Sequence, residues 1–369
     1  MVIDQLPKGI INMFHNEKRM GGTAVKAISL LLIAVMCLST VSCSNVEYAD
    51  GVIAGEHYGF SDGAFVYYMI MCAGALTEEE MKEHGYDENL ELDEMIYEGK
   101  TTWYDMLVNR ATDKMVSLLV YCEDAARAGI AIDDTDRSNI ESTLSEYRIA
   151  GLTAGNMTID QYLEYLYNYK ITEEDLKIIL ECEILAKKYS EYLNASFEEM
   201  ITDEDVNAAF EATNEADRDM TLTRRLGHIL LHNENYDYNE DEMQEKAEEI
   251  LKELTSETLT PERFESIAKE KSNDKNVFYE NVAKGDMVKN IDTWIYADDR
   301  KIGDCEIIES DYGLHIFYYA GDGDPLALVQ VRNSLVEKKY SDWYDKAQDT
   351  VNIKVKKRVI NNIKIGSDR

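Results

Sequence analysis

The sequence predicts an α+β fold, in which a mostly helical region precedes a small domain built from an antiparallel sheet and packed helices. Two observations carry this prediction. From residue 61 to about residue 219, apolar residues recur at three- and four-residue steps, as they do on amphipathic helices. Two later runs, 224–231 (RRLGHILL) and 312–319 (YGLHIFYY), have the length and composition of strands, and each is built around one histidine. A chain of 369 residues, 45% of them hydrophobic, is long enough for two cores.

The N-terminal segment differs from the rest of the chain. Three cations precede an apolar run at 27–40, which is shorter than the roughly 20 residues of a membrane-spanning helix, and small residues follow it. This order is typical of a secretory signal. Residues 40–43 (TVSC) resemble a bacterial lipobox, which implies lipidation of Cys43, although the first of the four is not the usual leucine. We therefore expect a signal peptide at 1–43 and a polar tether at 44–60, with an uncleaved signal anchor as the alternative.

Helices are predicted almost throughout the region 61–220. The clearest covers 101–129, where the apolar residues form one face and Gly129 is a plausible C-cap. Tyrosine and methionine stripes in this region are interpreted as core, with an apolar groove for unfolded chains as the alternative. The other expected elements are helices at 134–147, from 172 to about 192 and from 202 onward, with a loop at 151–156.

The region 221–322 has a different pattern, in which strands alternate with helices. Thr260 followed by Pro261 marks one helix start, because threonine is a good N-cap and proline is favoured at the first helical position. A Ser-Asn-Asp loop follows at 272–274. The remaining expected elements are a strand at 222–232, helices at 239–254 and 291–297, strands at 306–310 and 313–319, and a helical tail at 323–369.

The order of these elements, with one histidine in the first strand and one in the last, resembles the parvulin-type (PpiC) peptidyl-prolyl isomerase domain. The resemblance implies that His228 and His315 meet beneath the active site and that Asp274 lies beside the rotating carbonyl group of the substrate. It further implies that Met287 lines the pocket for the proline ring. Leu230 is expected to face the same pocket.

The domain order resembles that of the PrsA and SurA chaperone-foldases, in which a helical domain precedes the isomerase domain. We therefore expect a helical chaperone-like domain at 61–220 and a parvulin-like domain at 221–322. The segment 323–369 is expected to pack back on the helical domain. The function implied is that of an extracytoplasmic foldase and rotamase that acts on exported proteins.

The chain departs from the family pattern beside the predicted pocket. Residues 276–287 lack the family's glycine-rich segment, and Ile291 stands where a phenylalanine is usual. Trp294 is expected to supply the missing aromatic surface, with Tyr296 as the other possibility. These departures leave a second function open, namely a binding chaperone or assembly lipoprotein whose parvulin-like domain is catalytically inactive.

No cofactor and no metal ion are expected. Rotation about a peptide bond needs neither, and His228 with His232 lacks a third metal ligand. The net charge of −34 argues against nucleic acid as a partner, since phosphate binding needs clustered cations. The expected partners are unfolded or proline-containing exported polypeptides, and the membrane through a lipid on Cys43. The protein is then lipid-anchored on the extracytoplasmic face. The remaining cysteines have no metal spacing, and the sequence selects no disulfide pair.

Overall fold

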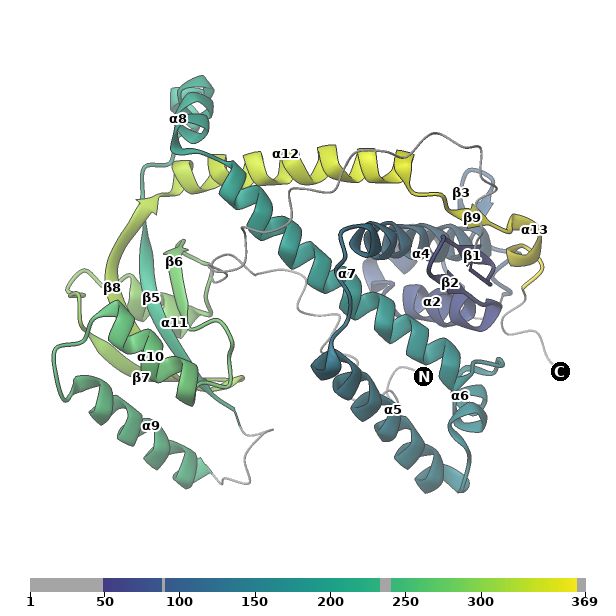
Figure 1. The fold of residues 1–369 in the computed structure, drawn as a ribbon, viewed down its shortest axis with the longest axis horizontal. Helices are drawn as coiled ribbons and strands as arrows, with labels where there is room; N and C mark the ends of the chain where they lie inside the picture. The colour runs from purple at the N-terminus through teal and green to yellow at the C-terminus, as the bar shows by residue number, and fades with distance from the viewer. Residues whose placement is uncertain (1–48, 88–89, 233–239, 364–369) are drawn as a thin grey trace. The chain divides into compact units, whose positions relative to one another are not determined.

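The computed structural model describes residues 49–87, 90–232 and 240–363 (Figure 1). The predicted signal peptide and Cys43 lie outside the described residues. Within the described part the chain forms two compact units. The first unit contains the residues up to Ser196 and those from Lys339 onward, and the second contains Phe197–Lys338. The second unit is therefore inserted into the first, as a matter of chain connectivity.

The first unit is mainly helical, as predicted. The helix predicted at 101–129 is confirmed as α4, and its N-cap Thr102 forms a capping box with Asp105. The loop predicted at 151–156 is wrong, because α5 continues through it and ends where Asn156 adopts a left-handed conformation. The elements up to the unit boundary are α2 (Asp62–Gly74), α3 (Glu78–Glu83), β3 (Ile96–Glu98), β4 (Thr101–Thr102), α4 (Trp103–Arg127), α5 (Asp134–Gly155), α6 (Ile159–Tyr167) and α7 (Glu173–Met200).

A small antiparallel sheet joins the two ends of the described chain. Its strands are β1 (Ile53–Ala54), β2 (Gly59–Phe60) and β9 (Lys354–Val355), in the order β2-β1-β9. Ile53 and Phe60 are fully buried. A tether reaching residue 60 is therefore wrong from Ile53 onward, because these apolar side chains belong to the core of the first unit. The short helix α13 (Lys357–Ile360) follows β9.

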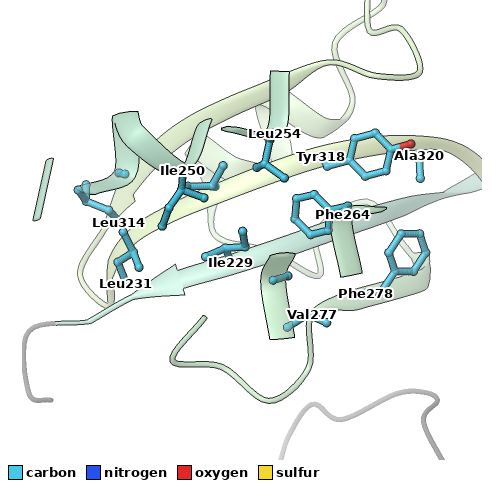
Figure 2. Close-up of a cluster of buried hydrophobic side chains, with 13 residues drawn as sticks. Ile229, Leu231, Ile250, Leu254, Phe264, Val277, Phe278, Leu314, Tyr318 and Ala320 are labelled. Carbon is cyan, nitrogen blue, oxygen red and sulfur yellow. The ribbon is translucent and has the colours of Figure 1, made fainter. Parts of the chain in front are cut away.

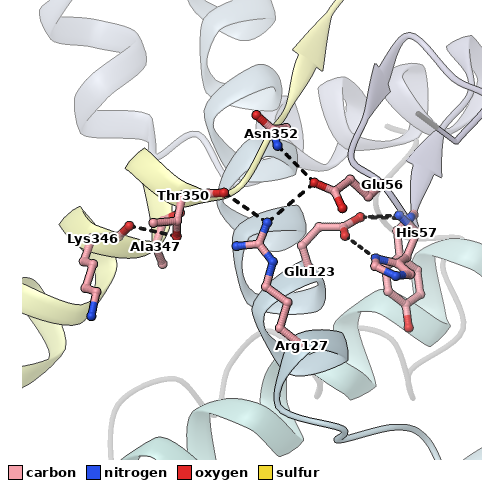
Figure 3. A network of polar contacts seen from close by, with 9 residues as sticks. Glu56, His57, Glu123, Arg127, Lys346, Ala347, Thr350 and Asn352 are labelled. Carbon is pink, nitrogen blue, oxygen red and sulfur yellow. Dashed lines mark hydrogen bonds and ion pairs between the residues drawn. The ribbon is translucent and has the colours of Figure 1, made fainter. Parts of the chain in front are cut away.

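A buried carboxylate on α4 holds the turn between β1 and β2. Glu123 is 1% exposed and accepts hydrogen bonds from the backbone N–H groups of His57 and Tyr58, at 2.8 and 3.0 Å. Its second oxygen lies 2.7 Å from His57 Nδ1 (Figure 3). Glycine is required at position 55, since a Cβ there would lie 2.3 Å from Glu123 Oε1. The carboxylate thus satisfies two backbone donors that the turn leaves unpaired.

The neighbouring residue on α4 binds the C-terminal segment. Asp124 accepts hydrogen bonds from Tyr189 Oη on α7 and from Trp343 Nε1 on α12 (Leu326–Thr350), at 2.8 and 2.7 Å. One turn later, Arg127 donates to the carbonyl oxygen of Thr350 at 3.0 Å (Figure 3). In the structure, residues from about 340 onward therefore contact the helices of the first unit.

The second unit is built around a four-stranded antiparallel sheet with the order β6-β5-β8-β7. Together with the helical first unit, this sheet confirms the α+β prediction. The strand β6, which replaces a predicted loop, was missed. The elements are α8 (Asp203–Ala212), a 3₁₀ turn (Glu215–Asp217), β5 (Leu222–Leu231), α9 (Glu240–Thr255), α10 (Pro261–Lys271), β6 (Phe278–Val282), α11 (Lys289–Ile295), β7 (Cys305–Ser310) and β8 (Gly313–Pro325).

The main core of this unit lies between the sheet and the helices α9 and α10. Phe264 on α10 is fully buried and stacks on Tyr318 of β8, with the ring centroids 5.3 Å apart (Figure 2). Ile229 and Leu231 of β5 lie in the same core. Because side chains alternate along a strand, their neighbours His228 and Leu230 project from the opposite face of the sheet. That opposite face is the one beside α11.

Candidate functional site

The two histidines are brought together by the pairing of β5 with β8. In this antiparallel register His228 lies opposite Phe317, and Leu230 lies opposite His315. Residues opposite each other share a face of the sheet, as do residues two apart on one strand. His228, Leu230, His315 and Phe317 therefore project on the same side of the sheet.

A chain of polar side chains runs across this face. His228 Nε2 lies 2.8 Å from His315 Nδ1, and the far nitrogen of His315, Nε2, lies 2.6 Å from Ser310 Oγ. At the other end, His228 Nδ1 lies 3.5 Å from Asp274 Oδ2, which is an ion-pair distance and longer than a well-formed hydrogen bond. We call Ser310, His315, His228 and Asp274 the polar chain.

One arrangement of protons is consistent with every contact of the polar chain. The carboxylate of Asp274 favours a proton on the nearest nitrogen, His228 Nδ1, so in a neutral ring His228 Nε2 is an acceptor. His315 Nδ1–H then donates to it, and His315 Nε2 accepts from the hydroxyl of Ser310. The same hydroxyl oxygen accepts the backbone N–H of Tyr312 at 3.1 Å. All donors along the polar chain therefore point towards Asp274.

Asp274 is positioned by a loop that binds the end of β5. Ser272 Oγ accepts the backbone N–H groups of Leu230 and of Asp274, both at 3.0 Å. The backbone N–H of Asn273 donates to the carbonyl of Leu230 at 2.8 Å. The Asp274 side chain itself accepts the N–H of Asn276, which forms an Asx turn. The Ser-Asn-Asp loop therefore fixes the carboxylate beside His228.

At the other end, a tight turn between β7 and β8 fixes Ser310. Ser310 pairs with Gly313, and the turn needs glycine there for two reasons. Gly313 has a φ of +125°, which favours glycine, and a Cβ would lie 2.3 Å from the carbonyl oxygen of Leu231. The glycine thus allows β8 to approach β5 closely, two residues before His315.

The electrostatic character of the site follows from its burial. His315 is only 7% exposed, and burial together with the neighbouring His228 lowers its pKa to about 4. Its ring is therefore neutral at pH 7. Burial alone would raise the pKa of Asp274, but His228 and the backbone N–H groups of the loop lower it below its usual value. Burial and the Asp274 carboxylate also raise the pKa of Tyr279, which stays a neutral phenol. The site presents one fixed negative charge near two groups that are neutral at pH 7, His315 and Tyr279.

An apolar cluster lies against the polar chain. It contains three of the predicted substrate-binding residues, since Ile291 is buried in it and Met287 and Trp294 pack on it. The fourth, Leu230, shares the face of the sheet but is partly exposed and lies outside the cluster. The cluster, which we call the α11 cluster, consists of Leu226, Val282, Ile291, Ile295, Phe317 and Tyr319, with Tyr279, Met287, Trp294, Tyr296 and Ile308 packed on it.

Phe317, which the sequence did not single out, connects the polar chain to the α11 cluster. Its ring is nearly parallel to those of His228 and His315, with centroid distances of 4.9 and 5.7 Å. The Trp294 ring lies 6.1 Å away. The sequence did contain a signal for this position, because Phe317 is two residues from His315 in the same strand and so shares its face. Ser310 and Tyr279 were also missed, and their positions depend on the turn and on β6, which periodicity does not reveal.

No group of three or more histidine, cysteine, aspartate or glutamate side chains in the described ranges is arranged to hold a metal ion. Within the same ranges, no helix is both long enough and apolar enough to cross a bilayer.

The part of the chain that contains this site matches the family model described as the rotamase, or PPIC-type peptidyl-prolyl isomerase, domain, over residues 228–321. The match begins at one histidine of the polar chain and includes the other three members. The chain therefore contains a domain of the PPIC-type peptidyl-prolyl isomerase family.

Comparison with solved structures finds similar chains of low identity. PrsA from Bacillus subtilis is 20% identical, with a TM-score of 0.32, over 73% of this chain and 91% of that one. The PrsA peptidyl-prolyl isomerase of Bacillus anthracis is also 20% identical, with a TM-score of 0.22, over 69% and 98%. A SurA-like chaperone of Campylobacter jejuni is 12% identical, with a TM-score of 0.23, over 76% and 94%. At these values the likenesses carry no argument about function. No curated protein matches the chain.

Proposed function

We propose that this chain is an extracytoplasmic foldase whose second unit catalyses the cis–trans isomerisation of X–Pro bonds in exported polypeptides. The observation that carries the proposal is the polar chain, which holds the Asp274 carboxylate beside the α11 cluster in a domain of the PPIC type. The site residues proposed are His228, Asp274 and His315 for catalysis. Leu230, Met287, Ile291 and Trp294 are proposed to hold the proline ring.

Catalysis of this rotation requires a pocket of suitable shape and a suitably placed charge. An amide resists rotation with a barrier of roughly 18–20 kcal/mol because resonance keeps it planar, and this resonance places negative charge on the carbonyl oxygen. Twisting the bond returns that charge to the nitrogen. A fixed carboxylate beside the carbonyl oxygen therefore repels the planar form more than the twisted form, which lowers the barrier. The two histidines hold the carboxylate in place and exchange no proton with the substrate.

The test is an isomerisation assay of the full chain on a proline-containing tetrapeptide, comparing the unchanged protein with Asp274→Asn. Removing the carboxylate charge at constant shape is expected to lower kcat/KM by about 100-fold, the scale seen for single electrostatic groups in other enzymes. Asp299→Asn is the matched control, since Asp299 is exposed and lies on a loop of the same unit. The catalytic proposal fails if the folded protein shows no rate above background, or if both variants behave alike.

The binding-chaperone alternative is favoured by one observation. Residues 278–282 form β6 in the stretch where the family has a glycine-rich segment, and Ile291 is buried within the cluster. Suppression of the aggregation of an unfolded client separates the two functions. If suppression persists unchanged in Asp274→Ala while the isomerase rate is lost, binding and catalysis reside in different parts of the chain. If suppression is lost with the carboxylate, the alternative is wrong.

We further propose that the chain is exported and anchored by a lipid on Cys43, with residues 61–220 acting as the chaperone-like domain. The support is the order of cations, apolar run and TVSC in the sequence. Metabolic labelling with a fatty acid in a bacterial host tests the anchor. Label is expected on the unchanged chain and absent from Cys43→Ala, whereas Cys72→Ala, a cysteine within α2, should remain labelled. Equal labelling of the unchanged chain and of Cys43→Ala would refute the lipid anchor.

A further inference from the structure

Two cysteines far apart in sequence meet inside the first unit. Cys122 on α4 and Cys182 on α7 are both fully buried, and the thiol of Cys122 donates to the carbonyl oxygen of Cys182 at 3.3 Å. The two residues are separated by 60 positions. Each helix therefore places one sulfur at the same buried interface.

The side chain of Cys122 also affects the Cys182 thiol. The pKa of the Cys182 thiol is raised well above its usual value, first by the hydrogen bond with the Cys122 side chain and then by burial. Both sulfurs lie near the phenol of Tyr58, whose pKa burial and the two thiols raise to about 12. The neighbourhood therefore disfavours the thiolate of Cys182 once the protein is folded.

We propose that Cys122 and Cys182 form a disulfide bond when the chain folds in the presence of a disulfide oxidant. One cysteine thiolate attacks a small disulfide such as glutathione disulfide, which releases one glutathione thiol and leaves a mixed disulfide. The second cysteine then attacks the protein sulfur of that intermediate and releases the second glutathione. Two protein thiols lose two electrons and two protons, and one glutathione disulfide becomes two glutathione molecules.

The burial of the pair sets the order of events. Because the thiolate is the nucleophile, the exchange takes place while α4 and α7 are still exposed to solvent during folding. Once the interface closes, the same burial excludes external thiols, and the bond resists reduction. The other two described cysteines, Cys72 and Cys305, are partly exposed and lie in different units. The structure therefore selects one pair where the sequence could not.

The bond would tie α7 to the part of α4 that already holds two other segments. Cys122 is followed directly by Glu123, which binds the β1–β2 turn, and by Asp124, which binds Tyr189 and Trp343. A covalent link at Cys122 would therefore restrict the region in which the N-terminal and C-terminal segments are joined. The inference concerns the first unit and does not depend on isomerase activity in the second.

The test is peptide mapping of the full chain after refolding from denaturant, either with glutathione disulfide and glutathione or with a reducing agent alone. Free thiols are then alkylated in denaturant and the chain is cut with trypsin. Cleavage at lysine and arginine gives peptides 115–127 and 178–187, each of which contains a single cysteine. We expect the two peptides to be recovered joined after oxidative refolding, and separately alkylated after reductive refolding.

A stability measurement accompanies the mapping. The oxidised chain is expected to unfold at a higher urea concentration than the reduced chain, as followed by far-ultraviolet circular dichroism. This upward shift should disappear in Cys122→Ala and in Cys182→Ala but persist in Cys72→Ala. The proposal is overturned if natively folded, oxidised protein yields both peptides singly alkylated, or if either cysteine is joined instead to Cys72 or Cys305. The mapping uses the unchanged chain, so it decides the matter even if a variant fails to fold.

Discussion

Lowering the pH from 7 to 5 is expected to destabilise the second unit through His315. Burial and His228 lower the pKa of this ring to about 4, whereas an unfolded chain titrates near the ordinary value of 6.5. Between these values the unfolded state binds a proton that the folded state does not. Stability is therefore full above about pH 6.5 and falls as the pH drops towards 4.

The size of the effect follows from the shift. A displacement from 6.5 to about 4 corresponds to about 3 kcal/mol when the full window is crossed, of which about 2 kcal/mol is lost by pH 5. Asp274 does not interfere in this range. Its pKa is lowered below the ordinary value of 3.8, so its contribution is lost only at still lower pH. The interval from pH 7 to 5 therefore lies above the range in which Asp274 contributes.

Two measurements check this reasoning. Proton–carbon NMR of labelled histidine in the full chain reports the titration of each ring, and His315→Asn assigns the signal. Urea unfolding, followed through the backbone amide signals of β5 and β8, compares the unchanged chain with His315→Asn at both pH values. The variant should lose about 2 kcal/mol less on acidification, whereas His84→Asn in the first unit should match the unchanged chain. A His315 ring that titrates near 6.5, or equal acid sensitivity of all three chains, would refute the argument.

Further substitutions test the packing and the polar chain. Gly227→Ala would place a Cβ 2.4 Å from the Phe264 ring and should cost about 1–3 kcal/mol in urea unfolding of the second unit. Glu123→Ala leaves two backbone donors of the β1–β2 turn unpaired, so the first unit should lose about 3 kcal/mol, while Glu123→Gln, which retains an acceptor, should lose less. Ser310→Ala removes the hydroxyl that donates to His315. The value of kcat/KM for a proline peptide should therefore fall about fivefold, a loss of about 1 kcal/mol. Unchanged values in these assays would contradict the contacts described.

Local signals predicted most of the elements correctly. The helices expected to begin at about residues 101, 202 and 260 begin in the structure after capping threonines, because capping depends on residues only three apart. The elements that were missed depend on partners distant in the chain. β1 and β2 each contain only two residues, and they form a sheet because β9 arrives from the other end of the described chain. A pattern of two residues cannot be distinguished from a polar segment without that partner.

The site residues show the same difference between features that a local pattern predicts and features that depend on distant partners. The distance between His228 and His315 could be anticipated from two strand-like runs and a family resemblance. The roles of Ser310 and Phe317 required the register of β7, β8 and β5, which is set by pairing and turn geometry. β6 was read as a loop because only its two ends are fully buried. Its membership of the sheet brings Tyr279 to the carboxylate, and no periodicity in residues 278–282 predicts that contact.

The antiparallel pairing of β1 with β9 has a consequence for the order in which the protein is made. β1 has no partner on its β9 side until residues 354–355 have been synthesised, and by then the whole of the inserted second unit has already been synthesised. The chain of the second unit is therefore synthesised in full before the β2-β1-β9 sheet of the first unit can form. A chain interrupted shortly before β9 would carry an intact isomerase domain on an unfinished helical unit, with the buried face of Ile53 left open.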